Sequence, residues 1–237
     1  MDRTKPIAII TGASTGIGKH VSVNLASHGY NVILISRNKG RLQKVEEEIK
    51  GNGHNCSSIV ADISNINSVK NIYKQIDKPH KIDVIVNNAG IGIFNKIQNI
   101  SLEEWDQQIN TNLRGSFLMT KMVINDMIKN KAGKIVFINS VAGINPYPFS
   151  SAYVASKYGL RGFSASLREE LREYKIKVIS IHPGAVDTPF WNNVKGDFPR
   201  EEMLAAKDVA KTITESILSP NNMVCEEIVI RRSAGDF

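Results

Sequence analysis

The chain has 237 residues and a mass of 26.2 kDa, which fits one α/β domain and leaves too little length for two catalytic domains. Hydrophobic residues make up 42% and charged residues 22%, as in globular proteins, so disordered and fibrous classes are excluded. Two cysteines cannot form a disulfide framework, and no apolar run approaches the roughly 18 residues of a membrane helix. Because residues 1–10 lack a signal-peptide pattern, we expect a cytoplasmic protein that does not bind membranes.

The charge balance is basic, with 30 Lys and Arg against 23 Asp and Glu, a formal net charge of +7. Such an excess is typical either of nucleic-acid binding or of a protein that takes an anionic cofactor. No compact basic tract with interleaved aromatic residues occurs, so an anionic cofactor is favoured and we expect no nucleic-acid partner.

Apolar, β-branched runs alternate along the chain with segments of helical periodicity. The predicted strands are 6–11, 31–36, 56–61, 82–87, 133–139, 176–182 and 224–231. The predicted helices are about 16–28, 39–51, 65–76, 101–129, 151–174 and 207–218. Continuous apolar strands between helices predict a doubly wound α/β fold, with seven parallel strands and helices on both faces.

No low-complexity linker or internal repeat divides the chain, so we expect one domain over residues 1–237. The longest stretch without a clear element is 183–200, which is rich in Pro and Gly and follows the sixth strand. Ligands of doubly wound sheets bind at the carboxyl ends of the strands. We therefore interpret 183–200 as a lid over a substrate.

The segment 11–18, Thr-Gly-Ala-Ser-Thr-Gly-Ile-Gly, joins the first strand to the first helix. Glycines at this place let the backbone approach a pyrophosphate, whose charge is met by amide N–H groups and the positive end of the helix. Three glycines in a turn can also be purely structural. Their position directly after the first strand favours a dinucleotide site.

The end of the second strand decides between NAD and NADP, because a carboxylate there binds the ribose 2′-hydroxyl and an Arg accepts a 2′-phosphate. This chain has Ser36-Arg37-Asn38 and no acid, with Lys39 and Arg41 nearby. A guanidinium suits a phosphate, so the sequence predicts NADP(H). The alternative is that Arg37 is an ordinary solvated residue that opens a helix.

Tyr153 and Lys157 stand four residues apart in the predicted helix 151–174 and so share one face of it. A nearby ammonium stabilises a phenolate and lowers the pKa of a tyrosine from about 10. The pair can then act as a general acid or base. A solvated surface pair is the alternative, since the same spacing arises often by chance.

With these motifs the sequence resembles the short-chain dehydrogenase/reductase family over essentially its whole length. Segment 11–18 matches the family's T-G-x-x-x-G-x-G pattern, 87–90 its N-N-A-G, and Tyr153 with Lys157 its Y-x-x-x-K. Asn112, Ser140 and the Pro-Gly pair at 183–184, followed by a threonine, also match. The resemblance implies a Rossmann fold and a nicotinamide-dependent oxidoreductase of the CH–OH class, such as a carbonyl or 3-oxoacyl reductase.

The resemblance also implies the catalytic roles. Tyr153 exchanges a proton with the carbonyl oxygen, Lys157 lowers the pKa of Tyr153 and holds the nicotinamide ribose, and Ser140 hydrogen-bonds the reacting oxygen. Asn112 anchors a water that links Lys157 to solvent. No metal ion is needed, because the nicotinamide carries the hydride.

The cofactor residues implied by the resemblance, with the Ser-Arg-Asn segment, are Gly12, Ser14, Thr15, Gly16, Ile17, Gly18, Ser36, Arg37, Asn38, Asp62, Ile63, Asn88, Ala89, Gly90, Tyr153, Lys157, Pro183, Gly184, Val186 and Thr188. The expected substrate residues are Ser140, Val141, Ile144, Tyr147, Phe190 and Trp191. Their apolar and aromatic character favours a small hydrophobic ketone, a 3-oxoacyl thioester or a hydroxy acid over a free sugar.

The sequence also departs from the family pattern. Position 15 is Thr, where NADP-dependent members often have a second basic residue, so Arg37 carries the cofactor choice. The ending 224–232 lacks the Gly-rich tail of many 3-oxoacyl reductases and is more like the branch acting on small ketones, hydroxy acids or pterin side chains.

A homodimer or homotetramer through helices 101–129 and 151–174 is expected from the family. A non-catalytic NADP-binding sensor or scaffold is the alternative function, and RNA binding through the basic surface a minor one.

Overall fold

The computed structural model describes residues 5–77, 81–194 and 198–235. A parallel sheet lies at its centre, with the strand order β3-β2-β1-β4-β5-β6-β9. Its strands are β1 (Ile7–Thr11), β2 (Asn31–Ser36), β3 (Cys56–Val60), β4 (Ile82–Asn87), β5 (Gly133–Ile138), β6 (Ile176–Pro183) and β9 (Glu227–Ile230). The predicted doubly wound α/β fold with seven parallel strands is confirmed.

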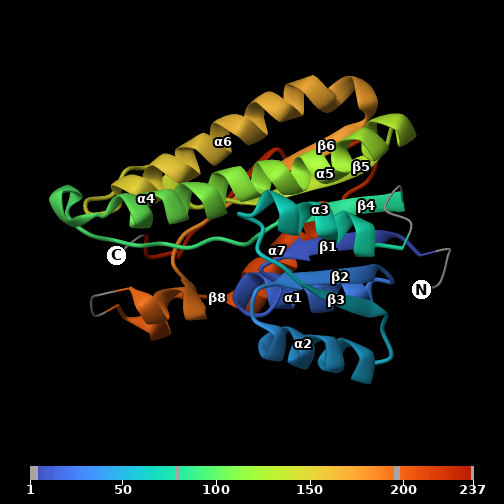
Figure 1. Cartoon of the computed structure of the whole chain (residues 1–237), viewed down its shortest axis with the longest axis horizontal. Helices are drawn as coiled ribbons and strands as arrows, with labels where there is room; N and C mark the ends of the chain where they lie inside the picture. Colours follow the sequence, from blue (N-terminus) through green and yellow to red (C-terminus); the bar gives the residue numbers. More distant parts are fainter. Residues whose placement is uncertain (1–4, 78–80, 195–197, 236–237) are drawn as a thin grey trace.

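Helices cover both faces of this sheet, as Figure 1 shows. They are α1 (Gly16–Ser27), α2 (Lys39–Gly51), α3 (Ile66–Gln75), α4 (Leu102–Gln108), α5 (Gly115–Asn130), α6 (Ser151–Leu171) and α7 (Ala206–Leu218). Successive strand side chains point to opposite faces. Ala8 and Ile10 therefore pack with the core of α1, α2 and α7, whereas Ile7 and Ile9 pack with that of α3, α5 and α6.

The strand order reverses at β1, which pairs with β2 on one side and with β4 on the other. The chain therefore crosses over from β1 and from β4 in opposite directions along the sheet. The loops after these two strands diverge from one another at the carboxyl edge of the sheet. A crevice at such a switch point is where doubly wound sheets bind ligands. The topology thus places the glycine segment beside the crevice.

The predicted helix 101–129 is not continuous. It begins with a capping box in which Ser101 and Glu104 satisfy each other's backbone N–H groups. A wide, π-helical turn, Ile109–Arg114, then separates α4 from α5. Such turns occur often at functional sites, and this one carries Asn112. Hydrophobic periodicity does not reveal the interruption, because apolar positions continue through it.

The segment 183–200, predicted without regular elements, contains the short strand β7 (Val186–Asp187) and a 3₁₀ turn, Pro189–Asn193. β7 pairs in parallel with β8 (Leu204–Ala205). Arg200 closes the segment, since its guanidinium binds the Asp187 carboxylate and donates to the carbonyl of Thr188 at 2.8 Å. Residues 195–197 lie outside the described part.

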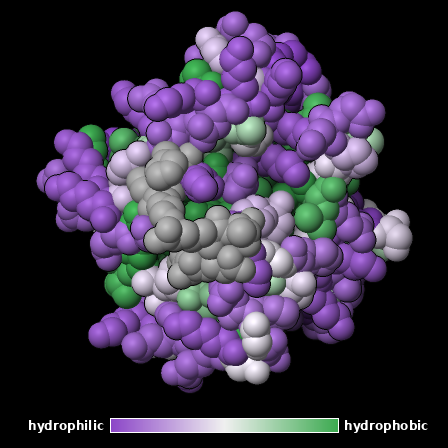
Figure 2. Space-filling view, turned by 90° about the vertical axis from the view of Figure 1, so that its right-hand side faces the viewer, coloured by the Kyte–Doolittle hydropathy of each residue, from purple (hydrophilic) through white to green (hydrophobic). Residues whose placement is uncertain are grey.

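The end of the molecule at which residue 5 enters β1 is largely hydrophilic, with apolar atoms in scattered places (Figure 2). In the described part of the chain, none of the helices combines the length and the apolar character that crossing a bilayer requires.

Candidate active site

A cavity of about 1010 Å³ opens at the carboxyl edge of the sheet. It extends from the glycine turn and Arg37 at one end to Tyr153 and the aromatic side chains of the 183–200 segment at the other. Small-molecule sites usually lie between roughly 300 and 1,000 Å³. The cavity is therefore large enough for an extended ligand.

The glycine turn forms one wall of the cavity. Its backbone conformation and its close neighbours do not allow side chains at Gly12 and Gly16. Gly12 and Gly16 have φ of +65° and +56°, where L residues are strained. A Cβ on Gly12 would lie 2.9 Å from the Ala89 Cα, and one on Gly16 would lie 2.9 Å from the Thr188 Cγ2. The cradle is thus shaped for close approach of a ligand such as a pyrophosphate.

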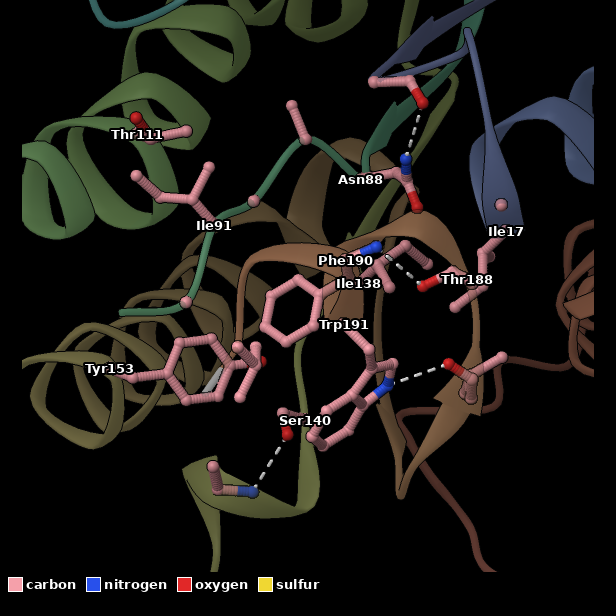
Figure 3. A pocket seen from close by; sticks show the side chains of 18 of the residues that line it. Ile17, Asn88, Ile91, Thr111, Ile138, Ser140, Tyr153, Thr188, Phe190 and Trp191 are labelled. Carbon is pink, nitrogen blue, oxygen red and sulfur yellow. Dashed lines mark hydrogen bonds between the residues drawn. The ribbon is translucent and has the colours of Figure 1, made fainter. Parts of the chain in front are cut away.

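Gly18 serves the same turn differently, because it does not line the cavity. A Cβ there would lie 2.4 Å from Asn88 Nδ2, so this glycine permits close packing of α1. The Asn88 amide donates to the carbonyls of Thr11 and Gly12, at 2.9 and 3.2 Å. Asn88 therefore locks the turn to the end of β4 while also lining the cavity, as Figure 3 shows.

The adenosine end of the site combines two arginines with one carboxylate. Arg37 lies 4.0 Å from the Asp62 carboxylate, and both line the cavity. Arg41, one turn further along α2, also lines it. Arg37 precedes α2, whose N-cap is Asn38, so the signal for Arg41 was its basic side chain close to Arg37 in the sequence.

Two residues of the predicted cofactor set behave differently from one another. Ser36 donates to the Ser14 hydroxyl at 2.8 Å, which joins the end of β2 to the glycine turn. Asn38 does not line the cavity. Its side chain accepts the Arg41 backbone N–H at 2.9 Å and caps α2. Capping thus occupies the Asn38 side chain, and its contact with the cofactor stays a prediction.

The other end of the cavity is lined by Ser140, Tyr153 and Lys157. Figure 3 shows the side chains of Ser140 and Tyr153 there. Ser140 acts on the Tyr153 phenol, whose pKa it lowers. Lys157 is 4% exposed, lies 5.7 Å from the Tyr153 ring centre, and donates to the Ile138 carbonyl at 3.0 Å. The i, i+4 pair thus faces the cavity, and a solvated surface pair is excluded.

Desolvation dominates the protonation of this pair. Burial raises the pKa of Tyr153 to about 12, and Ser140 lowers it only in part. Burial likewise lowers the pKa of Lys157 to about 8. The expectation that Lys157 lowers the Tyr153 pKa stays a prediction for the complex with the cofactor. The neutral phenol is the form that can donate a proton.

Asn112 lies behind the cavity wall and is fully buried. Its side chain accepts the Ile91 N–H and donates to the Ile91 carbonyl, both at 2.9 Å, and donates to Ser156 at 2.9 Å. The side chain therefore fixes the loop after β4 against α6. The π-helical turn supplies the extra room that this placement needs.

The substrate end is aromatic. The ring centres of Phe94 and Phe190 lie 5.4 and 5.8 Å from that of Tyr153, and Trp191 stands beside Phe190 (Figure 3). Val141 and Tyr147 line the cavity as predicted. Ile144 does not line it, and its contact with the substrate stays a prediction. Its carbonyl instead accepts the Tyr158 hydroxyl on the outer side of α6.

The cavity has further walls that no motif indicated. Contributions from outside the predicted site residues include Ile35, Ala61, Asn95, Lys96, Thr111, Asn139 and Arg232. Arg232 comes from the chain's last described residues and pairs with Glu202. Sequence reasoning had no signal for it, because only the course of the tail after β9 brings it to the site.

The family model described as short chain dehydrogenase matches residues 6–197. The chain belongs to the short-chain dehydrogenase family. The family resemblance predicted from the motifs is confirmed, and the chain is an oxidoreductase of this family. Short-chain dehydrogenases use nicotinamide cofactors, and the cradle at Gly12 and Gly16, which a Cβ would fill, fits the pyrophosphate of such a cofactor.

Individual short-chain dehydrogenases match over nearly their whole length. A sepiapterin reductase of Chlorobaculum tepidum is 33% identical, over 98% of each chain. A 3-oxoacyl-[acyl-carrier-protein] reductase of Synechocystis sp. is 36% identical, over 82% of this chain and 79% of that protein. A metagenomic short-chain oxidoreductase solved in complex with NADP superposes with a TM-score of 0.85 at 31% identity, covering 96% of this chain and 97% of that one.

Proposed function

We propose that this short-chain dehydrogenase reduces a carbonyl group to an alcohol with NADP(H), and catalyses the reverse oxidation. The observation that supports this most is the meeting of Ser140, Tyr153 and Lys157 at the closed end of the cavity. A protein that only binds its cofactor would not need a proton donor there.

The proposed mechanism assigns one task to each side chain. When bound, NADPH supplies the hydride that reduces the carbonyl carbon. Tyr153 donates its phenolic proton to the carbonyl oxygen, and Ser140 hydrogen-bonds the same oxygen and stabilises its developing charge. Lys157 holds ribose hydroxyls of the cofactor. Asn112 keeps the loop after β4 and α6 in register.

The cofactor is NADP(H) on the chemistry of its adenosine end. Arg37 and Arg41 line the cavity there, and the only carboxylate on that wall, in the described part of the chain, is that of Asp62. Two guanidinium groups suit a 2′-phosphate through charge-assisted hydrogen bonds. The NADP bound to the metagenomic relative agrees with this choice.

Arg37→Ala tests the cofactor assignment. Loss of one charge-assisted contact is expected to raise the Kd for NADPH by about 10- to 100-fold. The Kd for NADH should stay nearly constant, because NADH has no 2′-phosphate. Lys39→Ala is the matched control, since Lys39 is an exposed basic residue two positions further on that does not line the cavity. Equal loss of NADH and NADPH binding in Arg37→Ala would contradict the assignment.

The proposed substrate is a small hydrophobic ketone, a 3-oxoacyl thioester or a hydroxy acid. Phe94, Phe190 and Trp191 form an apolar wall next to Tyr153. We propose that the segment 183–200 acts as a lid, since it carries two of these rings and is tied down by Arg200. The relatives named as sepiapterin reductase and 3-oxoacyl reductase support carbonyl substrates of different sizes.

The function is tested by measuring NADPH oxidation with acyl, aromatic, diketone and 2-oxo-acid carbonyls, with NADH in parallel. We expect turnover with at least one hydrophobic carbonyl. Tight NADPH binding with no turnover across the panel would replace this proposal with a cofactor sensor or scaffold.

We also propose self-association through α5 and α6. Phe117 on α5 and Tyr158 on α6 are each 41% exposed, which is high for large side chains on long helices that flank one another. A two-fold pairing of these helices would cover both residues.

A further inference from the structure

A histidine that the proposed mechanism does not use lies directly beneath the catalytic serine. His182 belongs to β6 and is fully buried. Its Nδ1 lies 3.2 Å from the carbonyl oxygen of Ser140. A carbonyl oxygen can only accept, so Nδ1 bears the proton and donates it.

A histidine at this position costs free energy of folding. Along β6, Ile179 and Ile181 are fully buried and point to the opposite face of the sheet, whereas the fully buried Ser180 shares the face of His182. The Nε2 of His182 has no hydrogen-bond partner among the described residues. Burial of an unpaired polar atom costs free energy. An aliphatic side chain would fill the site without that cost, so packing alone does not account for the imidazole.

The contact that the imidazole makes is with the backbone that aims Ser140. The Ser140 carbonyl also accepts the Gly143 N–H at 2.9 Å, and the Ser140 hydroxyl oxygen accepts the Ala142 N–H at 3.1 Å. A Cβ on Gly143 would lie 2.9 Å from the Lys157 carbonyl oxygen, so the turn presses on α6. The turn therefore holds the serine through its own backbone N–H groups, and His182 holds the serine carbonyl from the neighbouring strand β6.

We propose that His182 is a positioning residue for carbonyl reduction: its Nδ1–H holds the Ser140 peptide so that the serine hydroxyl points at Tyr153 and the reacting oxygen. The inference rests on the proposed function and adds a residue to it. In this scheme His182 acts on the reaction only through Ser140. The imidazole itself touches neither substrate nor cofactor.

The imidazole stays neutral over the range in which the enzyme would be assayed. Burial lowers the pKa of His182, and this effect outweighs the others. The charged groups that act on it are Glu227 on β9, which raises its pKa, and Arg161 and Lys157 on α6, which lower it. Titration of His182 therefore does not account for a change in the pH profile above neutrality.

The experiment compares three variants of the full chain in both reaction directions. His182→Leu removes the donor and keeps an aliphatic volume, and His182→Asn keeps a side-chain N–H near the position of Nδ1. Ser180→Ala is the matched control, because Ser180 is buried on the same strand and its hydroxyl has no partner among the described residues. Thermal unfolding of each variant reports whether it folds.

We expect His182→Leu to lower kcat by about tenfold, which is the value of one hydrogen bond, with KM for NADPH unchanged. The pH at which alcohol oxidation reaches half its maximal rate should rise, because a misaligned Ser140 no longer lowers the Tyr153 pKa. His182→Asn should restore most of kcat, and Ser180→Ala should match the unsubstituted protein.

Two results would overturn the inference. One is an unchanged kcat and pH profile in folded His182→Leu. The other is His182→Asn as impaired as His182→Leu, with the pH profile of both unchanged, which would assign the histidine to packing. Absence of turnover in the unsubstituted protein would instead refute the proposed function, so the two failures are distinguishable.

Discussion

Tyr153→Phe is expected to lower kcat for carbonyl reduction by about 10³-fold, since the variant removes the only atom assigned to deliver the proton and general acid catalysis contributes roughly 10²–10⁴. The ring, with its contacts to Phe94 and Phe190, remains in place. NADPH affinity should therefore change little. Steady-state kinetics with the best carbonyl, together with fluorescence titration of NADPH, measures both quantities.

The matched control for this prediction is Tyr158→Phe. Tyr158 lies on the same helix, five residues on, and its hydroxyl donates to the Ile144 carbonyl away from the cavity. Its loss should leave kcat almost unchanged. If Tyr153→Phe kept most of the activity while Tyr158→Phe lost it, the assignment of the proton donor would be wrong.

Gly12→Ala is expected to weaken NADPH binding by about 100-fold, because the methyl group enters the cradle and the residue must keep a positive φ. At φ +65° an L side chain is strained, and its Cβ would lie 2.8 Å from Asn88 Nδ2 and 2.9 Å from the Ala89 Cα. The backbone of Ala89 cannot yield as a flexible side chain could. The turn must therefore shift away from the ligand.

Gly29→Ala separates this effect from backbone strain alone. Gly29 has φ +87°, and a Cβ there would meet nothing within 4 Å. Its substitution should cost about 1–2 kcal/mol of unfolding free energy and leave the Kd for NADPH unchanged. Isothermal titration and chemical unfolding of both variants test the comparison. Equal loss of affinity in the two variants would mean that the glycine turn does not contact the cofactor.

The sequence predicted the fold well because the sheet is buried on both faces. Runs such as 32–35 and 84–86 are continuously apolar and buried, which is typical of parallel strands with helices between them. The features of the fold that the sequence did not predict depend on hydrogen bonds. The π-helical turn at Ile109–Arg114 and the pairing of β7 with β8 arise from contacts between distant segments, so local periodicity does not predict them.

Residues with a fixed backbone task were predicted best in the site. The glycine turn and the Tyr153–Lys157 pair are defined by spacing within one element, and the structure brings both to the same cavity. The capping role of Asn38 was not predicted, because composition does not tell a cap from a ligand contact. Arg232 was missed because its approach depends on the whole sheet.

The electrostatics of the catalytic pair could not be predicted from spacing. Proximity of an ammonium lowers the pKa of a phenol, whereas burial raises it, and their balance depends on depth. Here burial of Tyr153 dominates and raises its pKa to about 12. A neutral phenol beside a buried lysine suits proton donation in the reductive direction.

The most direct test of carbonyl reduction by this chain is isotope transfer. The protein is incubated with the best carbonyl of the panel and with NADPH that carries deuterium in both positions on the reactive carbon of its nicotinamide, and the product is analysed by mass spectrometry. We predict an alcohol that carries one deuterium on its carbinol carbon, formed by the unsubstituted chain and not by Tyr153→Phe. An alcohol without deuterium, or equal labelled product from both proteins, would contradict the account.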